Sequence, residues 1–312
     1  MGGEVVRSGS ILTLALRERS GGKGRTRTLL PRRRSLRRCA NARLIAGSAI
    51  VLLLLGTAVF APLLAPHDPL EQQLLSAQLP PFWVHGADPS FPLGTDSLGR
   101  DVLSRLIYAA RVAALVALVA AGLACLIGTA LGLVAGFVGR WADALISRVI
   151  DVWMAFPPVL LSIVLAAVLG AGLGSVIVAI VTIDWTRFAR VVRAEVLVQS
   201  ARDYVVAARS LGLSGPAILM REVLPNVLPL ILTLLAVEMA IAVVVEAILS
   251  FVGLSVSSDT PTWGGMIAEG RQVIHEAWWI MAFPVLCLVL AALGFNLLGD
   301  GVRQAMTPGQ TR

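Results

Sequence analysis

Residues 112–139 read VAALVALVAAGLACLIGTALGLVAGFVG and contain no charged side chain. A helix that crosses a bilayer needs about 20 mainly apolar residues, so this stretch is long enough to form a transmembrane helix. The surrounding chain of 312 residues is 57% hydrophobic and only 14% charged, whereas a soluble domain averages about 25% charged residues. This composition excludes a disordered chain, a nucleic-acid-binding domain and an ordinary cytosolic enzyme, and indicates a polytopic membrane protein.

Further apolar stretches on both sides raise the number of expected spans to six. The stretch 152–183 is too long for one helix, and Gly170, Gly172 and Gly174 divide it into two helices, of which the second continues past Asp184. The first span is interpreted as a retained anchor and not as a signal peptide, because more than 40 residues precede it. The expected spans are residues 44–64, 112–139, the two halves of 152–183, 226–251 and 277–299.

Positive charge is concentrated at the start of the chain, where Lys23 and eleven arginines face only Glu4 and Glu18 in the first 44 residues. The net charge is +10 there and −3 in the remainder, since the whole chain carries +7. Cytoplasmic segments of membrane proteins are enriched in Lys and Arg, so we expect both termini in the cytoplasm. We expect the tail either to orient the protein in the membrane and contact anionic lipid, or to have a specific regulatory role.

This topology defines the expected parts of the chain. They are a basic, mobile cytoplasmic tail at 1–40, a six-span domain at 41–308 with an external loop at 66–105 and a cytoplasmic segment at 194–225, and a C-terminal end at 309–312.

The cytoplasmic segment 194–225 is longer than a connector requires. Residues 201–211 suit a short helix, which Gly212 can end with a positive φ angle. Pro216 suits the first turn of a second helix, and Pro225 begins the fifth span. Two interpretations remain open: a helix–turn–helix that binds a partner, or an amphipathic helix that rests on lipid headgroups.

The spacing within this segment carries a resemblance. Ala207-Ala208, then Gly212, then Leu224-Pro225 after eleven residues resembles the coupling loop of bacterial ABC importer permeases, although Val206 stands where that loop has an acidic residue. With the further motifs, residues 40–308 resemble the C-type permease subunit of the oligopeptide/dipeptide/nickel ABC importer family. These motifs are GTDSLGRDVLSRLIY at 94–108, EAILSFVGL at 246–254, PTWG at 261–264, AWW at 277–279 and FNLLGDG at 295–301.

The resemblance implies an all-α membrane protein with six transmembrane helices, in the type I ABC importer permease bundle (MetI-like), in the bacterial inner membrane. It implies a heterodimer with a homologous B-type permease, two ABC ATPase domains that bind ATP and Mg, and an extracytoplasmic substrate-binding protein; no nucleic acid is expected. The chain has no Gly-x-x-x-x-Gly-Lys-[Ser/Thr] loop, so we expect a non-catalytic subunit without metal or cofactor of its own.

The implied function is half of a translocation path for di- or oligopeptides. The same type of complex could import nickel or a glutathione-like compound, and a stand-alone secondary transporter is the alternative from another class. A membrane-embedded enzyme is disfavoured, since no histidine lies inside an expected span.

Three groups of candidate site residues follow. Glu238 and Glu246 lie in an apolar span, where burying an acidic side chain costs free energy. We expect them either to attract the amine of a substrate or to form hydrogen bonds or ion pairs within the bundle. Asp184 is interpreted as structural because Arg187 and Arg190 follow it. The coupling residues are Tyr204, Ala207, Ala208, Gly212, Ile218, Leu224 and Pro225. Asp96, Arg100, Asp101 and Arg105 form either an ion-paired cap on the second span or a contact with binding protein or peptide.

Overall fold

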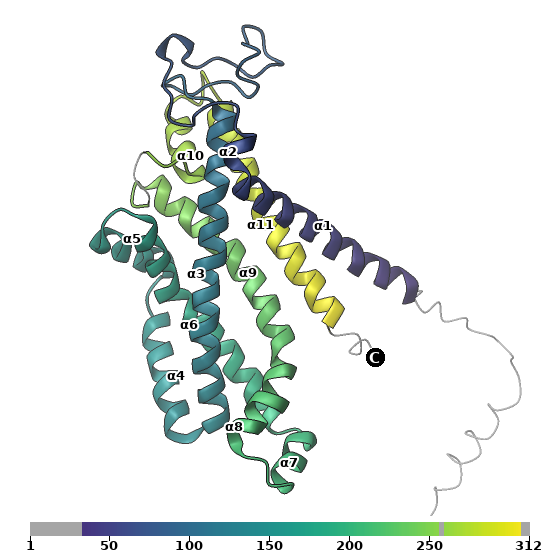
Figure 1. Ribbon diagram of the computed structural model, residues 1–312. Coiled ribbons are helices and arrows are strands. Elements are labelled where there is room, and N and C mark those ends of the chain that lie inside the picture. The colour runs from purple at the N-terminus through teal and green to yellow at the C-terminus, as the bar shows by residue number, and fades with distance from the viewer. Residues whose placement is uncertain (1–32, 256–258, 307–312) are drawn as a thin grey trace, which may run out of the picture. The chain divides into compact units, whose positions relative to one another are not determined.

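The computed structural model describes residues 33–255 and 259–306, and its regular structure there is helical without a strand. The chain divides into two units, Met1–Arg37 and Arg38–Arg312, and every contact below lies within the second. A 3₁₀ turn lies at Leu74–Ser76 and a π-turn at Leu219–Val223. The helices in Figure 1 are α1 (Arg33–Val59), α2 (Ala61–Leu64), α3 (Val102–Val138), α4 (Arg140–Met154), α5 (Pro158–Leu169), α6 (Leu173–Ser200), α7 (Asp203–Ser210), α8 (Gly215–Ile218), α9 (Leu224–Phe251), α10 (Trp263–Gln272) and α11 (Trp279–Met306).

Helix α3 is longer at its start than the uncharged run 112–139 predicts. The Asp101 carboxylate caps the helix by accepting hydrogen bonds from two backbone N–H groups of the first turn, at 3.2 and 3.0 Å. Arg111 set the start of the predicted span, but the helix extends back past it, and Arg105 in this extension is buried among acids within the helical bundle. The helix ends before Gly139, whose φ angle is 67°.

Helices α3 and α6 pack closely through Gly128, Gly132 and Gly136, which lie four residues apart on one face of α3. A Cβ atom on Gly132 would lie 2.8 Å from the carbonyl oxygen of Ala189, and one on Gly136 would lie 2.8 Å from that of Arg193. Because the contacts advance along both helices together, α3 and α6 are parallel. Helices α4 and α5 therefore return the chain from the end of α3 to the start of α6.

This return is bent, which the sequence did not predict. Helices α4 and α5 meet at an angle of 85°, because Pro157 and Pro158 disfavour helical geometry in the residues before them. The Trp153 indole N–H donates to the carbonyl oxygen of Thr182 at 2.5 Å and holds the bend against α6. The predicted division after α5 is confirmed: Gly170 has a φ angle of 84° between α5 and α6.

The predicted number of spans is not established by the helices themselves. In the described part of the chain, four helical stretches are long and apolar enough to cross a membrane, or five if the bent α4–α5 pair counts as one span. Helix α6, the sixth predicted span, is not among them, because Asp184, Arg187 and Arg190 interrupt its apolar sequence. Six spans therefore stay a prediction. The four stretches are Ala42–Val59, α3, Gly215–Phe251 and α11.

Helix α1 packs antiparallel to α11. A Cβ atom on Gly301 would meet Leu44, and one on Gly47 would meet the backbone of Leu298. Helix α1 begins at Arg33, so residues 33–40 of the expected tail are helical, because the helix extends past the apolar run that marked its predicted start; residues 1–32 and the C-terminal end 309–312 lie outside the described part.

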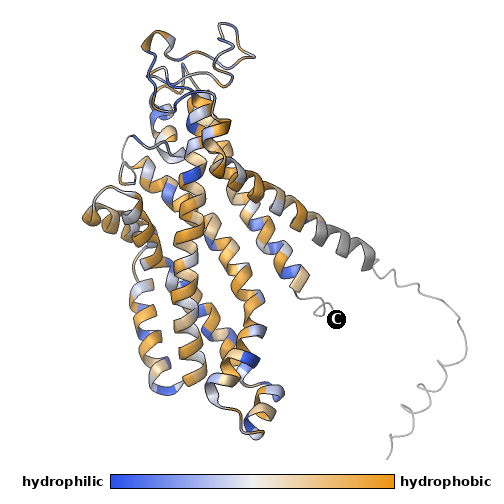
Figure 2. Ribbon diagram, viewed as in Figure 1, coloured by the Kyte–Doolittle hydropathy of each residue, from blue (hydrophilic) through white to orange (hydrophobic). Residues whose placement is uncertain are grey.

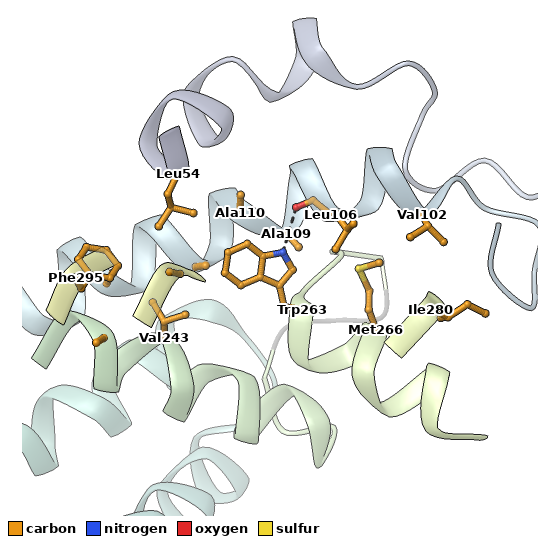
Figure 3. Packing of buried hydrophobic residues seen from close by; sticks show 14 of the residues in the cluster. Leu54, Val102, Leu106, Ala109, Ala110, Val243, Trp263, Met266, Ile280 and Phe295 are labelled. Carbon is orange, nitrogen blue, oxygen red and sulfur yellow. Dashed lines mark hydrogen bonds between the residues drawn. The ribbon is translucent and has the colours of Figure 1, made fainter. Parts of the chain in front are cut away.

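The core near the start of α3 joins five helices, α1, α3, α9, α10 and α11. Figure 3 shows Trp263 of α10 inserted among Leu54, Ala110 and Val243, with its indole N–H donating to the carbonyl oxygen of Leu106 at 3.2 Å. Figure 2 shows hydrophobic residues along most of α3, α9 and α11. The buried faces and the outward faces of these helices are therefore both apolar, as expected for helices in contact with lipid.

Candidate functional site

The segment between α6 and α9, residues 201–223, is called the elbow below. Helix α7 ends at Ser210, and Gly212 then has a φ angle of 81°, which confirms the predicted positive φ. The Gly212 N–H donates to the carbonyl oxygen of Arg209 at 3.0 Å, and the Leu213 N–H donates to that of Ala208 at 3.2 Å. These two bonds form a Schellman motif, which turns the chain sharply toward α8.

One face of the elbow is anchored in the bundle. Val205, Ala208 and Ile218 are buried in one apolar cluster with Val192 and Val196 of α6. Leu224 packs against the same cluster. The elbow is therefore a fixed part of the fold and not a loose connector.

Tyr204 adds a polar link between α7 and α6. Its hydroxyl donates to Oε1 of Gln199 at 2.9 Å, and the Gln199 amide donates to Oε1 of Glu195 at 2.7 Å. Burial raises the pKa of the Tyr204 phenol, so the hydroxyl stays a neutral donor.

The opposite face of the elbow is exposed and partly apolar. Ala207 and Gly212 are exposed, with Val206 53% and Leu211 80% accessible. Ala208 does not belong to this face, because it points into the chain's own cluster. Leu211 was missed by the sequence reasoning, although an apolar residue directly before a helix-ending glycine is a signal that could have found it.

Pro225 lies in the first turn of α9, as predicted, but the chain does not leave helical geometry before it. One helical stretch runs from Gly215 to Phe251, and the π-turn Leu219–Val223 directly precedes the proline. A proline removes one backbone donor, and the wider turn together with the Asn226 side chain, which donates to the carbonyl oxygen of Glu222 at 2.7 Å, accommodates it. Helix α8, the second half of the elbow, is thus continuous with α9.

Buried charges lie where α6 and α9 meet. Arg187 of α6 donates to both carboxylate oxygens of Glu238 on α9, at 3.4 and 3.3 Å, and Glu238 is 1% exposed. Asp184 is 4% exposed and has no hydrogen bond or ion pair within the described residues. Its neighbours pair elsewhere, because Arg190 donates to Asp151 at 3.1 Å. Asp184 and Arg187 line a cavity of about 320 Å³ between α5, α6, α9 and α11.

Glu246 lies apart from this cavity. It is 1% exposed, and its Oε1 accepts hydrogen bonds from the hydroxyls of Ser250 at 2.5 Å and Ser255 at 3.3 Å. These contacts match the predicted alternative in which Glu246 is bonded within the bundle. The structure does not bring Glu246 and Glu238 together in one site.

The external motif is ion-paired and buried. Asp96 accepts from Nε of Arg100 at 2.7 Å and from Arg105, and both arginines also donate to Glu269 of α10, at 2.9 and 2.6 Å. Asp101 caps α3. Because Asp96 and Asp101 have almost no exposed surface, the ion-paired cap describes them better than a contact with another molecule. Glu269 was missed, although two buried arginines beside one acid require a second.

Two families match the chain. Residues 128–312 match the family described as binding-protein-dependent transport system inner membrane component. Residues 34–81 match the N-terminal transmembrane domain of oligopeptide transport permease C.

Several curated proteins are similar over most of their length. A di/tripeptide transport system permease protein of Pseudomonas aeruginosa is 39% identical over 85% of this chain and 87% of its own. A dipeptide transport system permease protein of Escherichia coli is 37% identical over 85% and 88%. A glutathione transport system permease protein of Pectobacterium atrosepticum is 37% identical over 85% and 86%.

A solved structure supports the fold. A chain of the MetNI methionine ABC transporter, in an inward-facing conformation, superposes with a TM-score of 0.56 at 18% identity and covers 65% of this chain and 96% of its own. At that identity the likeness concerns the fold alone. From the match over residues 128–312 and from these relatives, the chain belongs to the binding-protein-dependent transport system inner membrane components and is a permease subunit of an ABC importer.

Proposed function

We propose that this permease imports peptides and receives energy from ATPase subunits through the elbow. The observation that carries the proposal is the two-sided elbow: Val205 and Ala208 anchor one face, while Val206 and Leu211 are exposed on the other. An ATPase groove that holds Leu211 would move α7, and the continuous helix from Gly215 to Phe251 would carry that motion into the bundle.

The complex proposed around the chain follows the family. A homologous B-type permease completes the translocation path as a heterodimer, two ATPase domains hold ATP and Mg, and an extracytoplasmic binding protein delivers the substrate. The elbow and both termini lie in the cytoplasm in this arrangement, which agrees with the concentration of basic residues in the tail.

The names of the relatives support di- or oligopeptides as substrates. Glutathione is a second candidate, because the relative named for glutathione transport is as similar as the Escherichia coli relative named for dipeptides. Both candidates carry a free ammonium group and amide bonds, so one path could serve either.

The test is ATP-driven uptake by the intact complex in proteoliposomes with its binding protein, using labelled dialanine, glutathione and Ni²⁺ in parallel. We expect dialanine uptake to need ATP on the elbow side of the membrane. Leu211→Asp should abolish uptake and co-purification of the ATPases, because it charges the exposed apolar contact. Uptake of Ni²⁺ without either peptide would refute the peptide assignment.

Leu75→Asp is the matched control, because Leu75 is an exposed leucine like Leu211 but lies in the external loop. It should keep the ATPases bound. If Leu211→Asp retains ATPases and uptake like the control, the elbow is not the coupling surface and the lipid-resting interpretation is preferred.

A further inference from the structure

The cavity between α5, α6, α9 and α11 has the composition of a small-molecule site. Fifteen residues line it, and only Ser162, Asp184, Arg187 and Asn296 among them are polar. Ligand sites are commonly apolar with a few convergent polar groups, and they start at about 300 Å³. The question is which chemical group these four side chains would recognise.

Arg187 is already engaged. Its guanidinium pairs with Glu238 of α9, which does not belong to the cavity lining. Asp184, one turn earlier on α6, interacts electrostatically with both but is bonded to neither. The three side chains therefore carry two carboxylates and one guanidinium. A buried carboxylate without a partner is costly in a membrane, and a cation in the cavity would complete the pairing.

Ser162 and Asn296 each offer a free acceptor atom to the cavity. The Ser162 hydroxyl donates its hydrogen to the carbonyl oxygen of Val159 at 2.8 Å, which leaves its lone pairs. The Asn296 amide donates to the carbonyl oxygen of Ala292 at 2.8 Å, which leaves its own oxygen. An ammonium group has three donors and no acceptor, so it can donate to Asp184 and to these two oxygens, while Arg187 stays paired with Glu238.

We propose that this cavity binds the α-ammonium group of a peptide on its way through the membrane, with Asp184 as its counter-ion and the apolar wall against the first side chain. The proposal rests on the peptide function above. A transition metal fits less well, because the cavity offers one carboxylate and neither histidine nor cysteine.

The first test measures charge preference without a peptide. In the intact complex, with Cys39, Cys125 and Cys287 replaced by alanine, Val244→Cys in the cavity wall is reacted with a cationic trimethylammonium or an anionic sulfonate methanethiosulfonate reagent. The cationic reagent should react faster. Asp184→Asn should reduce the ratio of the two rates about ten-fold, as for a lost charged contact.

Two control variants show whether the reagent preference depends on the negative charge at residue 184. Asp184→Glu keeps the charge and should keep the ratio, while Asp151→Asn removes an exposed, arginine-paired acid on α4 and should also keep it. A ratio unchanged by Asp184→Asn would overturn the proposal.

The second test is dialanine uptake. Asp184→Asn should raise the half-saturating concentration about ten-fold, without changing how the isolated binding protein binds dialanine. If the wild-type complex transports no peptide at all, the peptide function fails while the reagent ratio can still identify a cation site. If peptide is transported but neither the ratio nor the half-saturating concentration changes in Asp184→Asn, this inference alone is refuted.

Discussion

Asp96 connects the external loop to the bundle. It has no exposed surface, accepts from the backbone N–H groups of Leu98 and Arg100, and pairs with two arginine side chains that also reach Glu269 on α10. Removing one member of a buried ion pair leaves the others uncompensated. This residue therefore stabilises the junction of loop, α3 and α10.

Asp96→Asn should lower the free energy of unfolding by about 3 kcal/mol, the range measured for broken buried ion pairs. Thermal unfolding of the purified protein in detergent measures this as a lower Tm. Glu71→Gln is the control, since Glu71 is an exposed acid of the same loop, and its Tm should match the wild type. An Asp96→Asn variant as stable as the control would show that the network contributes no stability.

At the scale of elements, the pair α3 and α6 depends on small residues. Backbones approach closely in membranes where glycine removes the side chain, and Gly132 lies against the carbonyl oxygen of Ala189 with no room for a methyl group. Gly122 lies on the same helix and has open space where its Cβ would be. The two glycines thus form a matched pair.

Gly132→Ala should destabilise the bundle by about 1–3 kcal/mol, because the added methyl group overpacks the interface. Gly122→Ala should be neutral or slightly stabilising, since alanine favours the helix. The difference in Tm between the two variants checks this. Equal Tm values would mean that α3 and α6 do not approach as closely as described.

The sequence predicted the elements better than their ends. Uncharged length identified α3, α9 and α11, and Gly170 and Gly212 marked real turns with positive φ. The predicted ends were wrong where a charged residue or a proline, which usually ends a membrane helix, is accommodated by its neighbours in the fold. Arg105 is tolerated in α3 because Glu269 of α10 and Asp96 of the preceding loop pair with it, and Pro225 is tolerated because a π-turn precedes it.

The candidate site was predictable only in part for a similar reason. Apolar context drew attention to Glu238 and Glu246, but which acid faces a cavity depends on partners far away in sequence. Ser250 and Ser255 donate hydrogen bonds to Glu246. Arg187 donates to Glu238, and Asp184 accepts no hydrogen bond from either arginine near it. Ala208 was predicted to face a partner because small residues suit contacts, yet which side of α7 is buried depends on α6.

Coupling across the whole complex requires that the elbow lie in the cytoplasm with one face free for the ATPases. The elbow follows α6, which is parallel to α3, so the elbow and the end of α3 face the same side of the membrane. The loop before α3, with Leu75, faces the opposite side. The accessibility of positions 211 and 75 from each side of the membrane therefore tests both the topology and the coupling surface.

The most direct measurement is labelling of Leu211→Cys with a membrane-impermeant maleimide, in a chain whose native cysteines are replaced, with Leu75→Cys beside it. In inside-out vesicles without ATPases, residue 211 should be labelled quickly and residue 75 should not. Restoring the ATPase subunits should protect residue 211. Labelling of residue 211 only in right-side-out cells, or no protection by bound ATPases, would contradict the account.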